Sequence, residues 1–131
     1  MTMAAQNLTG VWHGLYTYPN GLSVSFVATL IDGGGAFTGS THEQDGFGGG
    51  GMIYASVSGS LAGSAVTFSK SYNVDDPRYA NSIAYEGTLS GDGTEIEGSW
   101  RLPNDWSGKF MMIRSSGKAE TVKRKEAIGA Q

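Results

Sequence analysis

Apolar and polar residues alternate with a period of two along most of this chain, and glycine, proline, asparagine and aspartate interrupt the alternation at intervals. A period of two is typical of β-strands with one buried face, and the interrupting residues favour turns. Eight runs are long enough to be strands: 11–18, 22–32, 36–43, 53–61, 65–72, 82–89, 95–102 and 106–114. No segment between them has helical periodicity, so the pattern predicts an all-β protein.

The connections between these runs alternate between short and long. Three are tight turns with the sequences DGGG, LAGS and SGDG, whereas the others include the long segments QDGFGGGGM and NVDDPRYAN. Eight antiparallel strands joined in chain order form a meander, and a meander loses its exposed edges by closing on itself. We therefore predict one closed eight-stranded antiparallel up-and-down β-barrel over residues 7–114. The short turns would form its floor and the long loops its mouth, and residues 115–131 would form a charged tail that is flexible or a short helix.

Composition narrows the possible partners. The 131 residues are enough for one domain, with 39 % hydrophobic residues, 16 % charged residues and a net charge of −3. This mild negative charge argues against nucleic acid or an anionic membrane as a partner. The absence of cysteine from the sequence excludes disulfides and thiolate metal sites. No signal-like or membrane-spanning run is present in the sequence, so we expect a cytoplasmic protein.

The first and last predicted strands suggest how the floor is closed. Trp12 begins the first strand between Gly10 and Gly14, and Arg114 ends the last strand. In a closed barrel these two strands are neighbours, so the indole would plug the floor with the guanidinium laid across its ring. Such a cation–π contact contributes roughly 0.5–2 kcal/mol. We predict a structural role for both residues.

The same residues carry a family resemblance. A Gly-x-Trp first strand and a closing arginine resemble the calycin superfamily of lipocalins, fatty-acid-binding proteins and avidins. The segments LTGVW, GAFTG, VTFSK, GDGTEIEGSWRL and DW follow one another in the order and at about the spacing of avidin-type chains. The resemblance covers about residues 7–114, and it implies an eight-stranded barrel with a ligand at its open end and possible assembly into homo-oligomers.

The avidin resemblance also implies which ligand residues are shared. Trp100 and Trp106 match two tryptophans of the avidin cavity. The polar residues that hold biotin are not matched, because their positions fall at Gly14, Tyr18, Thr41 and Arg114 here. Each lost hydrogen-bond partner of a buried head group costs about 1–3 kcal/mol. Biotin itself is therefore not the expected ligand.

Alternation, with Trp12 setting the phase, predicts which side chains face the mouth. The candidate ligand-binding residues are Tyr16, Tyr18, Glu43, Lys70, Tyr72, Tyr85, Trp100 and Trp106. Glu43 and Lys70 would form a charged pair in a partly apolar cup, either to bind an anionic or carbonyl-bearing head group or as a rim or structural pair. Inward glycines at 14, 39, 87, 98 and 108 would either leave room for a ligand or let the strands coil.

Catalytic and metal chemistry have little support in the sequence. His13 should face outward, and His42 and Glu43 point to opposite faces of a strand, which prevents them from converging on a metal ion. We predict no metal site and no cofactor. Phe47, in the glycine-rich loop, would lie at the entrance beside Trp106.

The predicted function is therefore non-catalytic binding of a small apolar or aromatic ligand that carries a polar or anionic group. One alternative is a ligand-free homo-oligomeric barrel, with an outward patch of Val27, Ile31, Met111 and Ile113. The other is a barrel enzyme acting on a small hydrophobic substrate with Glu43 as its base.

Overall fold

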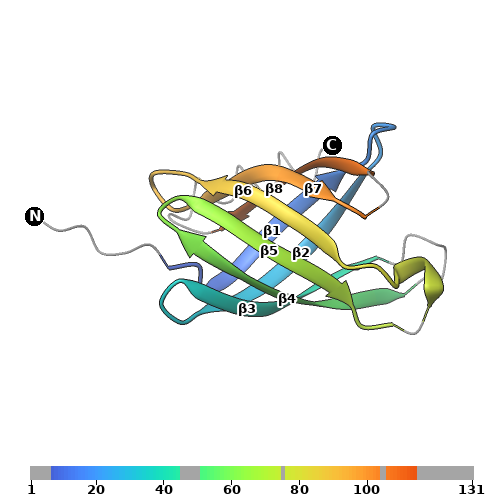
Figure 1. The fold of residues 1–131 in the computed structure, drawn as a ribbon, viewed down its shortest axis with the longest axis horizontal. Helices are drawn as coiled ribbons and strands as arrows, with labels where there is room; N and C mark the ends of the chain where they lie inside the picture. The colour runs from blue at the N-terminus through green and yellow to red at the C-terminus, as the bar shows by residue number, and fades with distance from the viewer. Residues whose placement is uncertain (1–6, 45–50, 75, 104–105, 115–131) are drawn as a thin grey trace, which may run out of the picture.

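The computed structural model describes residues 7–44, 51–74, 76–103 and 106–114 as one closed antiparallel barrel (Figure 1). Its strands follow one another around the barrel in chain order. They are β1 (Gly10–Thr17), β2 (Ser23–Asp32), β3 (Ala36–Gln44), β4 (Met52–Ala62), β5 (Ala65–Tyr72), β6 (Ile83–Leu89), β7 (Glu95–Arg101) and β8 (Ser107–Arg114). The predicted fold class is confirmed, and the predicted strand ends agree within one or two residues.

The two ends of the barrel differ as the connection lengths predicted. The tight turns after β2, β4 and β6 lie together on the left in Figure 1, and the longer connections lie on the right. One of these long connections contains a 3-10 turn, η1 (Pro77–Tyr79), where no helical periodicity was predicted. We call the short-turn end the floor and the other end the mouth.

Barrel closure depends on the pairing of β1 with both β2 and β8. Trp12 pairs with Ala28 on one side and with Arg114 on the other. Every strand therefore has two hydrogen-bonded neighbours, and the described barrel has no open sheet edge.

The inward glycines are explained by close packing rather than by room for a ligand. A methyl group at Gly98 would lie 1.9 Å from the carbonyl oxygen of Glu86, and one at Gly39 would lie 2.1 Å from that of Thr29. At Gly14 the space is filled by the Phe26 ring, 2.2 Å from where a Cβ would stand. At these positions the space beside the glycine is therefore taken by neighbouring strands or side chains and is not open to a ligand.

Side chains fill the barrel from the floor to below the mouth. The buried cluster includes Trp12, Tyr16, Phe26, Ala28, Leu30, Phe37, Val57, Val66, Phe68, Tyr85, Leu89, Ile96, Trp100, Phe110 and Met112. The void between Phe26, Phe37, Phe68 and their neighbours measures about 10 Å³. An eight-stranded barrel is just wide enough either to fill with side chains or to hold one small ligand. The floor side of this barrel is a packed core.

The floor is closed as the sequence predicted. The Arg114 guanidinium lies 4.5 Å from the centre of the fully buried Trp12 ring. Trp12 donates its indole N–H to the carbonyl of Leu8, which is also fully buried, and Arg114 donates to the carbonyl of Gly93. Asp32 accepts the backbone N–H of Leu8. The segments before β1 and after β6 thus meet around the Trp12 indole. Leu8 and Asp32 also belong to the floor, and the alternation pattern did not identify them.

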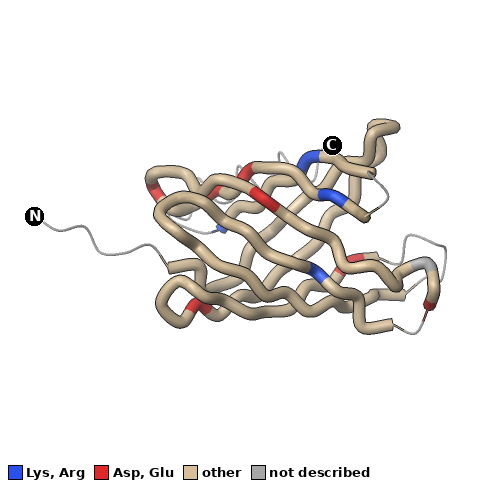
Figure 2. Tube along the Cα trace, viewed as in Figure 1, with Lys and Arg blue, Asp and Glu red and all other residues tan. Residues whose placement is uncertain are grey.

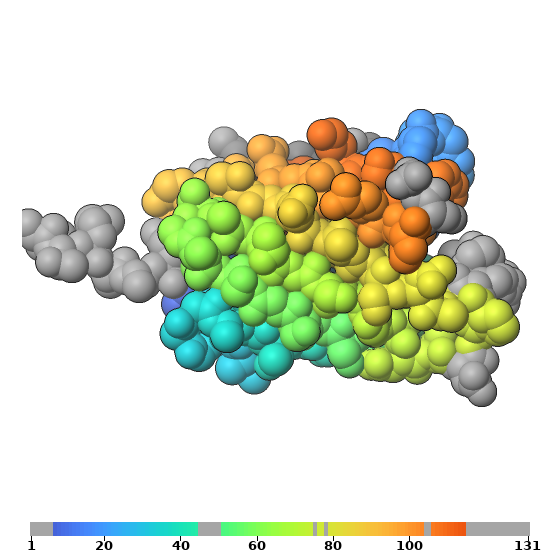
Figure 3. Space-filling view, in the orientation of Figure 1, coloured from blue at the N-terminus to red at the C-terminus, as the bar shows by residue number. Residues whose placement is uncertain are grey.

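Among the described residues, most charged positions lie on β6, β7, β8 and the turn between β6 and β7, whereas β4 has none (Figure 2). Side chains of β3 to β7 form the side seen in Figure 3. For one residue of the outward apolar patch that was predicted as an oligomer interface, the predicted exposure is wrong. Ile113 is only 2 % exposed, flanked in the sheet by His13 and Glu95, although Ile31 is 66 % exposed. No helix in the described ranges is long and apolar enough to cross a membrane.

Candidate functional site

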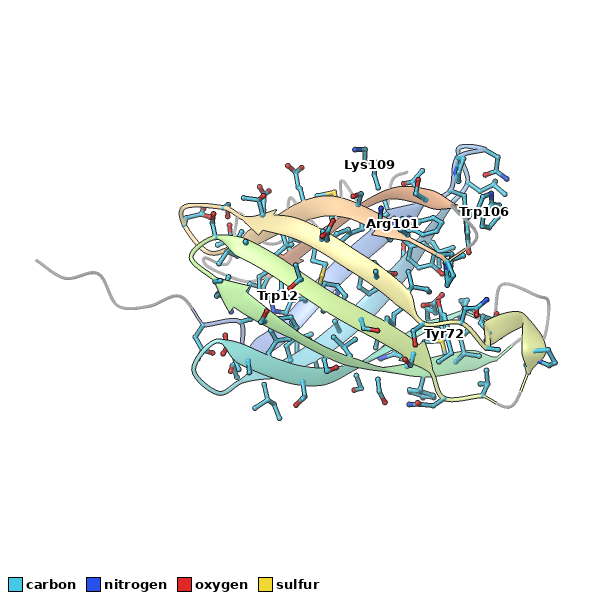
Figure 4. The ribbon with its side chains drawn as sticks, viewed as in Figure 1. Trp12, Tyr72, Arg101, Trp106 and Lys109 are labelled. Atoms are coloured by element: carbon cyan, nitrogen blue, oxygen red, sulfur yellow. The ribbon has the colours of Figure 1, made fainter. Side chains whose placement is uncertain are left out.

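The mouth of the barrel holds a cup of about 260 Å³. Its lining is mostly aromatic and comes from four of the strands and the segments next to them. The lining residues are Tyr16, Tyr18, Tyr72, Tyr79, Asn81, Ile83, Tyr85, Trp100, Leu102 and Trp106. Figure 4 shows Trp106 and Tyr72 at the mouth end of the barrel, with Trp12 far away toward the floor. The described residues that line the cup carry no formal charge.

Two aromatic pairs form much of the upper wall. Tyr18, just after β1, and Trp106, just before β8, have ring centres 5.3 Å apart. Tyr72, at the end of β5, and Tyr79, in η1, have ring centres 4.7 Å apart. Trp100 lies deeper, 5.5 Å from Tyr18, and its indole N–H donates to the carbonyl of Thr17. This hydrogen bond, the edge contact of Trp100 with Tyr18 and the tilted contacts of the two pairs hold the ring orientations, so the cup wall is preformed.

A polar network lies directly beneath the cup and is centred on the carboxylate of Glu43, on β3. The Tyr16 hydroxyl donates a short hydrogen bond to Oε2 of Glu43. The Tyr72 hydroxyl and the Lys70 ammonium each lie 3.1 Å from Oε1. The carboxylate therefore accepts three hydrogen bonds, from β1 and β5, while it is only 3 % exposed. The network links three strands that are not neighbours in the sheet.

Lys70 is held in an aromatic cage below this carboxylate. Its side chain is 1 % exposed, and Nζ lies 4.6 to 5.5 Å from the ring centres of Tyr16, Tyr72, Phe26 and Tyr85. Burial lowers the pKa of Lys70, and the Glu43 carboxylate offsets part of that change. The cation is thus matched by one carboxylate and several π faces, the arrangement that a buried ammonium requires.

The same burial keeps the cup phenols protonated. Burial raises the pKa of Tyr16 and Tyr72 far above the ordinary value of 10, and the nearby Glu43 carboxylate raises both further. Burial also raises the pKa of Tyr85, whose ring stacks on Phe68 at 4.6 Å. These hydroxyls are hydrogen-bond donors and acceptors across the physiological pH range, and they do not act as bases.

This protonation makes the barrel sensitive to alkali. A phenol with a raised folded pKa stabilises the fold fully below pH 10 and progressively less above it, because the unfolded chain then releases protons that the folded chain keeps. Between pH 10.5 and 11.5 we expect the three tyrosines to lower the free energy of unfolding by about 3 kcal/mol. The lowered pKa of Lys70 has the opposite effect, since it raises the free energy of unfolding as the pH rises. This contribution fades over the same range, because lysine in the unfolded chain deprotonates. Urea unfolding at the two pH values measures the change.

Two variants check that assignment. Tyr85→Phe should remove about a third of the alkaline loss, because one of the three phenols is gone. Tyr54→Phe alters an exposed tyrosine and should leave the loss unchanged. An alkaline loss that stays the same in Tyr85→Phe would contradict the assignment of the effect to these phenols.

Most residues that the sequence placed at the mouth do line the cup, but two do not. Tyr16, Tyr18, Tyr72, Tyr85, Trp100 and Trp106 line it, whereas Glu43 and Lys70 lie beneath it. The predicted contact of these two charges with a ligand needs correction, because they are 3 % and 1 % exposed and bonded to each other. Of the two interpretations of this pair, a structural one agrees with the observed geometry.

Sequence reasoning missed other lining residues. Tyr79 and Asn81 lie outside regular strands, where alternation gives no phase, and Leu102, which has the inward phase of Trp100, directly follows the end of β7 and was not selected. Tyr79 could have been identified because it is an aromatic residue in a long loop predicted at the mouth. Phe47, predicted at the entrance, lies outside the described residues, as does the tail over 115–131.

Other parts of the described surface are weaker candidates for a functional site. A groove of about 320 Å³ lies on the outer face of β6, β7 and β8, between Glu86, Arg101 and Lys109. Those three side chains are exposed, and Figure 4 shows Arg101 and Lys109 on the outer side of the barrel. In the described ranges no group of three histidine, cysteine, aspartate or glutamate side chains is placed to hold a metal ion. The mouth cup, with its buried polar base, is the better candidate site.

Comparison with known proteins identifies other proteins with the same barrel fold. No protein-family model matches the chain, and no curated protein matches it. A redesigned β-barrel aligns with a TM-score of 0.70 at 11 % identity, over 83 % of this chain and 92 % of that one. A de novo designed fluorescence-activating β-barrel aligns at 0.63 and 14 % identity, over 88 % of this chain and 100 % of that one. The mFAP2b barrel bound to DFHBI aligns at 0.66 and 11 % identity, over 82 % of this chain and 94 % of that one. At these identities the likeness concerns the fold alone: the chain has the eight-stranded barrel architecture of these designed proteins.

Proposed function

We propose that the cup at the mouth binds a small apolar or aromatic molecule with one polar group, without chemical conversion. The observation that carries this proposal is the cup itself, a preformed hollow of about 260 Å³ walled by aromatic rings above a packed core. Ligand sites are typically concave and mostly apolar, with a few polar groups that fix orientation. The Tyr16 and Tyr72 hydroxyls would supply the polar contact here.

We also propose that the chain is related to the avidins, because its motifs resemble those of avidin-type chains. We further propose that the protein is cytoplasmic. Avidins hold a small molecule at the open end of an eight-stranded barrel, and the similar mFAP2b structure is bound to the small molecule DFHBI, which supports small-molecule binding here. Biotin is not the proposed ligand, because Gly14 and Thr41 stand where its polar partners would be needed.

The geometry favours binding over catalysis at this site. Glu43 is the only mouth residue that was a candidate base, and its two oxygens already accept hydrogen bonds from Tyr16, Tyr72 and Lys70. A general base must be within hydrogen-bond reach of the proton that it removes. Glu43 does not line the cup, so a bound molecule would meet the phenols first.

The first experiment is calorimetric titration with DFHBI and with a set of one- and two-ring aromatic molecules. We expect at least one to bind with a Kd below about 1 mM, since this corresponds to only about 4 kcal/mol of binding free energy. Trp106→Ala should weaken that binding about tenfold or more, because Trp106 is a half-exposed aromatic wall of the cup.

Tyr54→Ala provides the matched control. Tyr54 is an exposed aromatic residue on the outer face of β4, 57 % exposed, and it does not line the cup. Its replacement should leave the Kd unchanged. If Trp106→Ala and Tyr54→Ala weaken binding equally, or if nothing in the set binds, the cup is not the binding site. Native mass spectrometry of protein from its own cells would then show whether the barrel functions as a ligand-free assembly.

A further inference from the structure

We propose that the polar group of the ligand is an organic ammonium rather than an anion. This inference rests on the proposed function of the cup and specifies its ligand class. It revises the anionic head group that the sequence suggested, and four features of the mouth support it.

The first feature is the direction of the hydroxyl protons. A phenol has one proton to donate, and both Tyr16 and Tyr72 direct theirs at the Glu43 carboxylate. The two phenol oxygens lie 3.4 Å apart. What they can offer to a molecule in the cup is therefore lone pairs. An ammonium or other donor can use these lone pairs, whereas a carboxylate or phosphate finds no proton there.

The second feature is the wall. The rings of Tyr18 and Trp106 form one side of the cup, and those of Tyr72 and Tyr79 form another. An aromatic face is the negative part of its quadrupole and attracts a cation. An anion placed against the same faces would lose its hydration without compensation.

The third feature is the position of the charges. Lys70, whose ammonium contacts the Tyr16 and Tyr72 rings, lines the small void on the core side and is bonded to Glu43. The hydroxyls of Tyr16 and Tyr72, two residues that line the cup, contact the carboxylate. At these two residues the cup is therefore backed by a carboxylate, while the ammonium lines the void on the core side. The negative net charge of the chain acts in the same direction.

The fourth feature is an internal precedent. Lys70 is itself an alkylammonium held by one carboxylate and by the rings of Tyr16, Phe26, Tyr72 and Tyr85. The barrel thus already binds this chemical group with these side-chain types, one layer below the cup. A ligand ammonium in the cup would use the same chemistry with the rings of Tyr18, Tyr79 and Trp106, which are not part of the Lys70 cage.

Three probes of nearly equal shape test the proposal: 2-phenylethylammonium, 2-phenylethanol and 3-phenylpropanoate, titrated by calorimetry at pH 7 and low salt. We expect the ammonium to bind about tenfold more tightly than the alcohol, as one good cation–π contact provides, and the carboxylate to bind weakest. If the alcohol or the carboxylate equals the ammonium, the cup binds ligands but this inference is wrong. If none of the three binds while DFHBI or another aromatic does, the inference is again wrong. If no aromatic molecule binds at all, the proposed function fails as well.

Variants locate the preference within the cup. Trp106→Leu should reduce the advantage of the ammonium over the alcohol from about tenfold to about threefold or less, because it removes a π face but keeps an apolar wall. Tyr72→Phe keeps the ring and removes one acceptor oxygen, so it should reduce the same ratio. Tyr54→Leu, on the outer face, should leave the ratio unchanged. If Tyr72→Phe does not fold, as judged by circular dichroism, Trp106→Leu decides alone, and an unchanged ratio in that variant overturns the proposal.

Discussion

Lys70→Met should lower the free energy of unfolding by about 3–5 kcal/mol, the usual cost of breaking a buried ion pair by removing one partner. Methionine has nearly the length of lysine, so the loss does not come from a large cavity. It comes from the Glu43 carboxylate, which would stay buried among aromatic rings with only the two phenol donors. Urea denaturation followed by circular dichroism measures the change.

The double variant Glu43→Leu/Lys70→Met gives the matched comparison. Replacing a buried ion pair by apolar side chains is often neutral or stabilising. The double variant should therefore recover most of the stability that Lys70→Met loses, and the Tyr16 and Tyr72 hydroxyls can still bond to each other at 3.4 Å. Lys109→Met, at an exposed lysine on β8, should change stability by about 0.5 kcal/mol at most. A loss of under about 1 kcal/mol in Lys70→Met would contradict the buried pair.

Gly98→Ala should have the other large effect, a loss of about 3 kcal/mol or more, at the upper end of what overpacking costs. The added methyl group would lie 1.9 Å from the carbonyl oxygen of Glu86 and 2.5 Å from the Cα of Gly87. Both atoms belong to the backbone of β6, so no side-chain rotation can relieve the contact. The strands would have to separate, and the hydrogen bonds between β6 and β7 would weaken.

Gly91→Ala separates this effect from the general preference for glycine. A methyl group at Gly91, in the turn between β6 and β7, would meet nothing within 4 Å. We expect this variant to differ from the parent by about 0.5 kcal/mol or less, as surface substitutions usually do. If Gly98→Ala were equally mild in urea denaturation, close approach of β6 and β7 would not explain the glycine at position 98.

Much of the fold could be predicted because each strand has one face in the core and one in solvent. With Trp12 setting the phase, alternation placed Tyr16, Tyr85 and Trp100 inside the barrel, as observed. The alternation of short and long connections then predicted which end was closed. These are local signals, and they suffice when neighbouring strands in the chain are also neighbours in the sheet.

The depth of the charged pair could not be predicted in the same way. Glu43 and Lys70 are on β3 and β5, which are separated by β4, so no direct pairing relates them. Whether they meet at the rim or beneath it depends on the combined register of two strand pairs and on side-chain length. Tyr79 and Asn81 were missed for a different reason, because they lie in irregular backbone without a period. Alternation predicts which face a residue occupies, but not its height along the barrel axis.

The pairing of β1 with β8 has a consequence for the newly made chain. Trp12 is buried against Arg114, a residue synthesised about a hundred positions later. Until β8 leaves the ribosome, β1 and the growing end of the sheet are open edges, and such edges can pair with other chains. The floor cannot close earlier, because Arg114, which lies over the Trp12 ring, is the last residue of β8. A ribosome-bound chain truncated before β8 should therefore be protease-sensitive, whereas the released chain should resist cleavage between its strands.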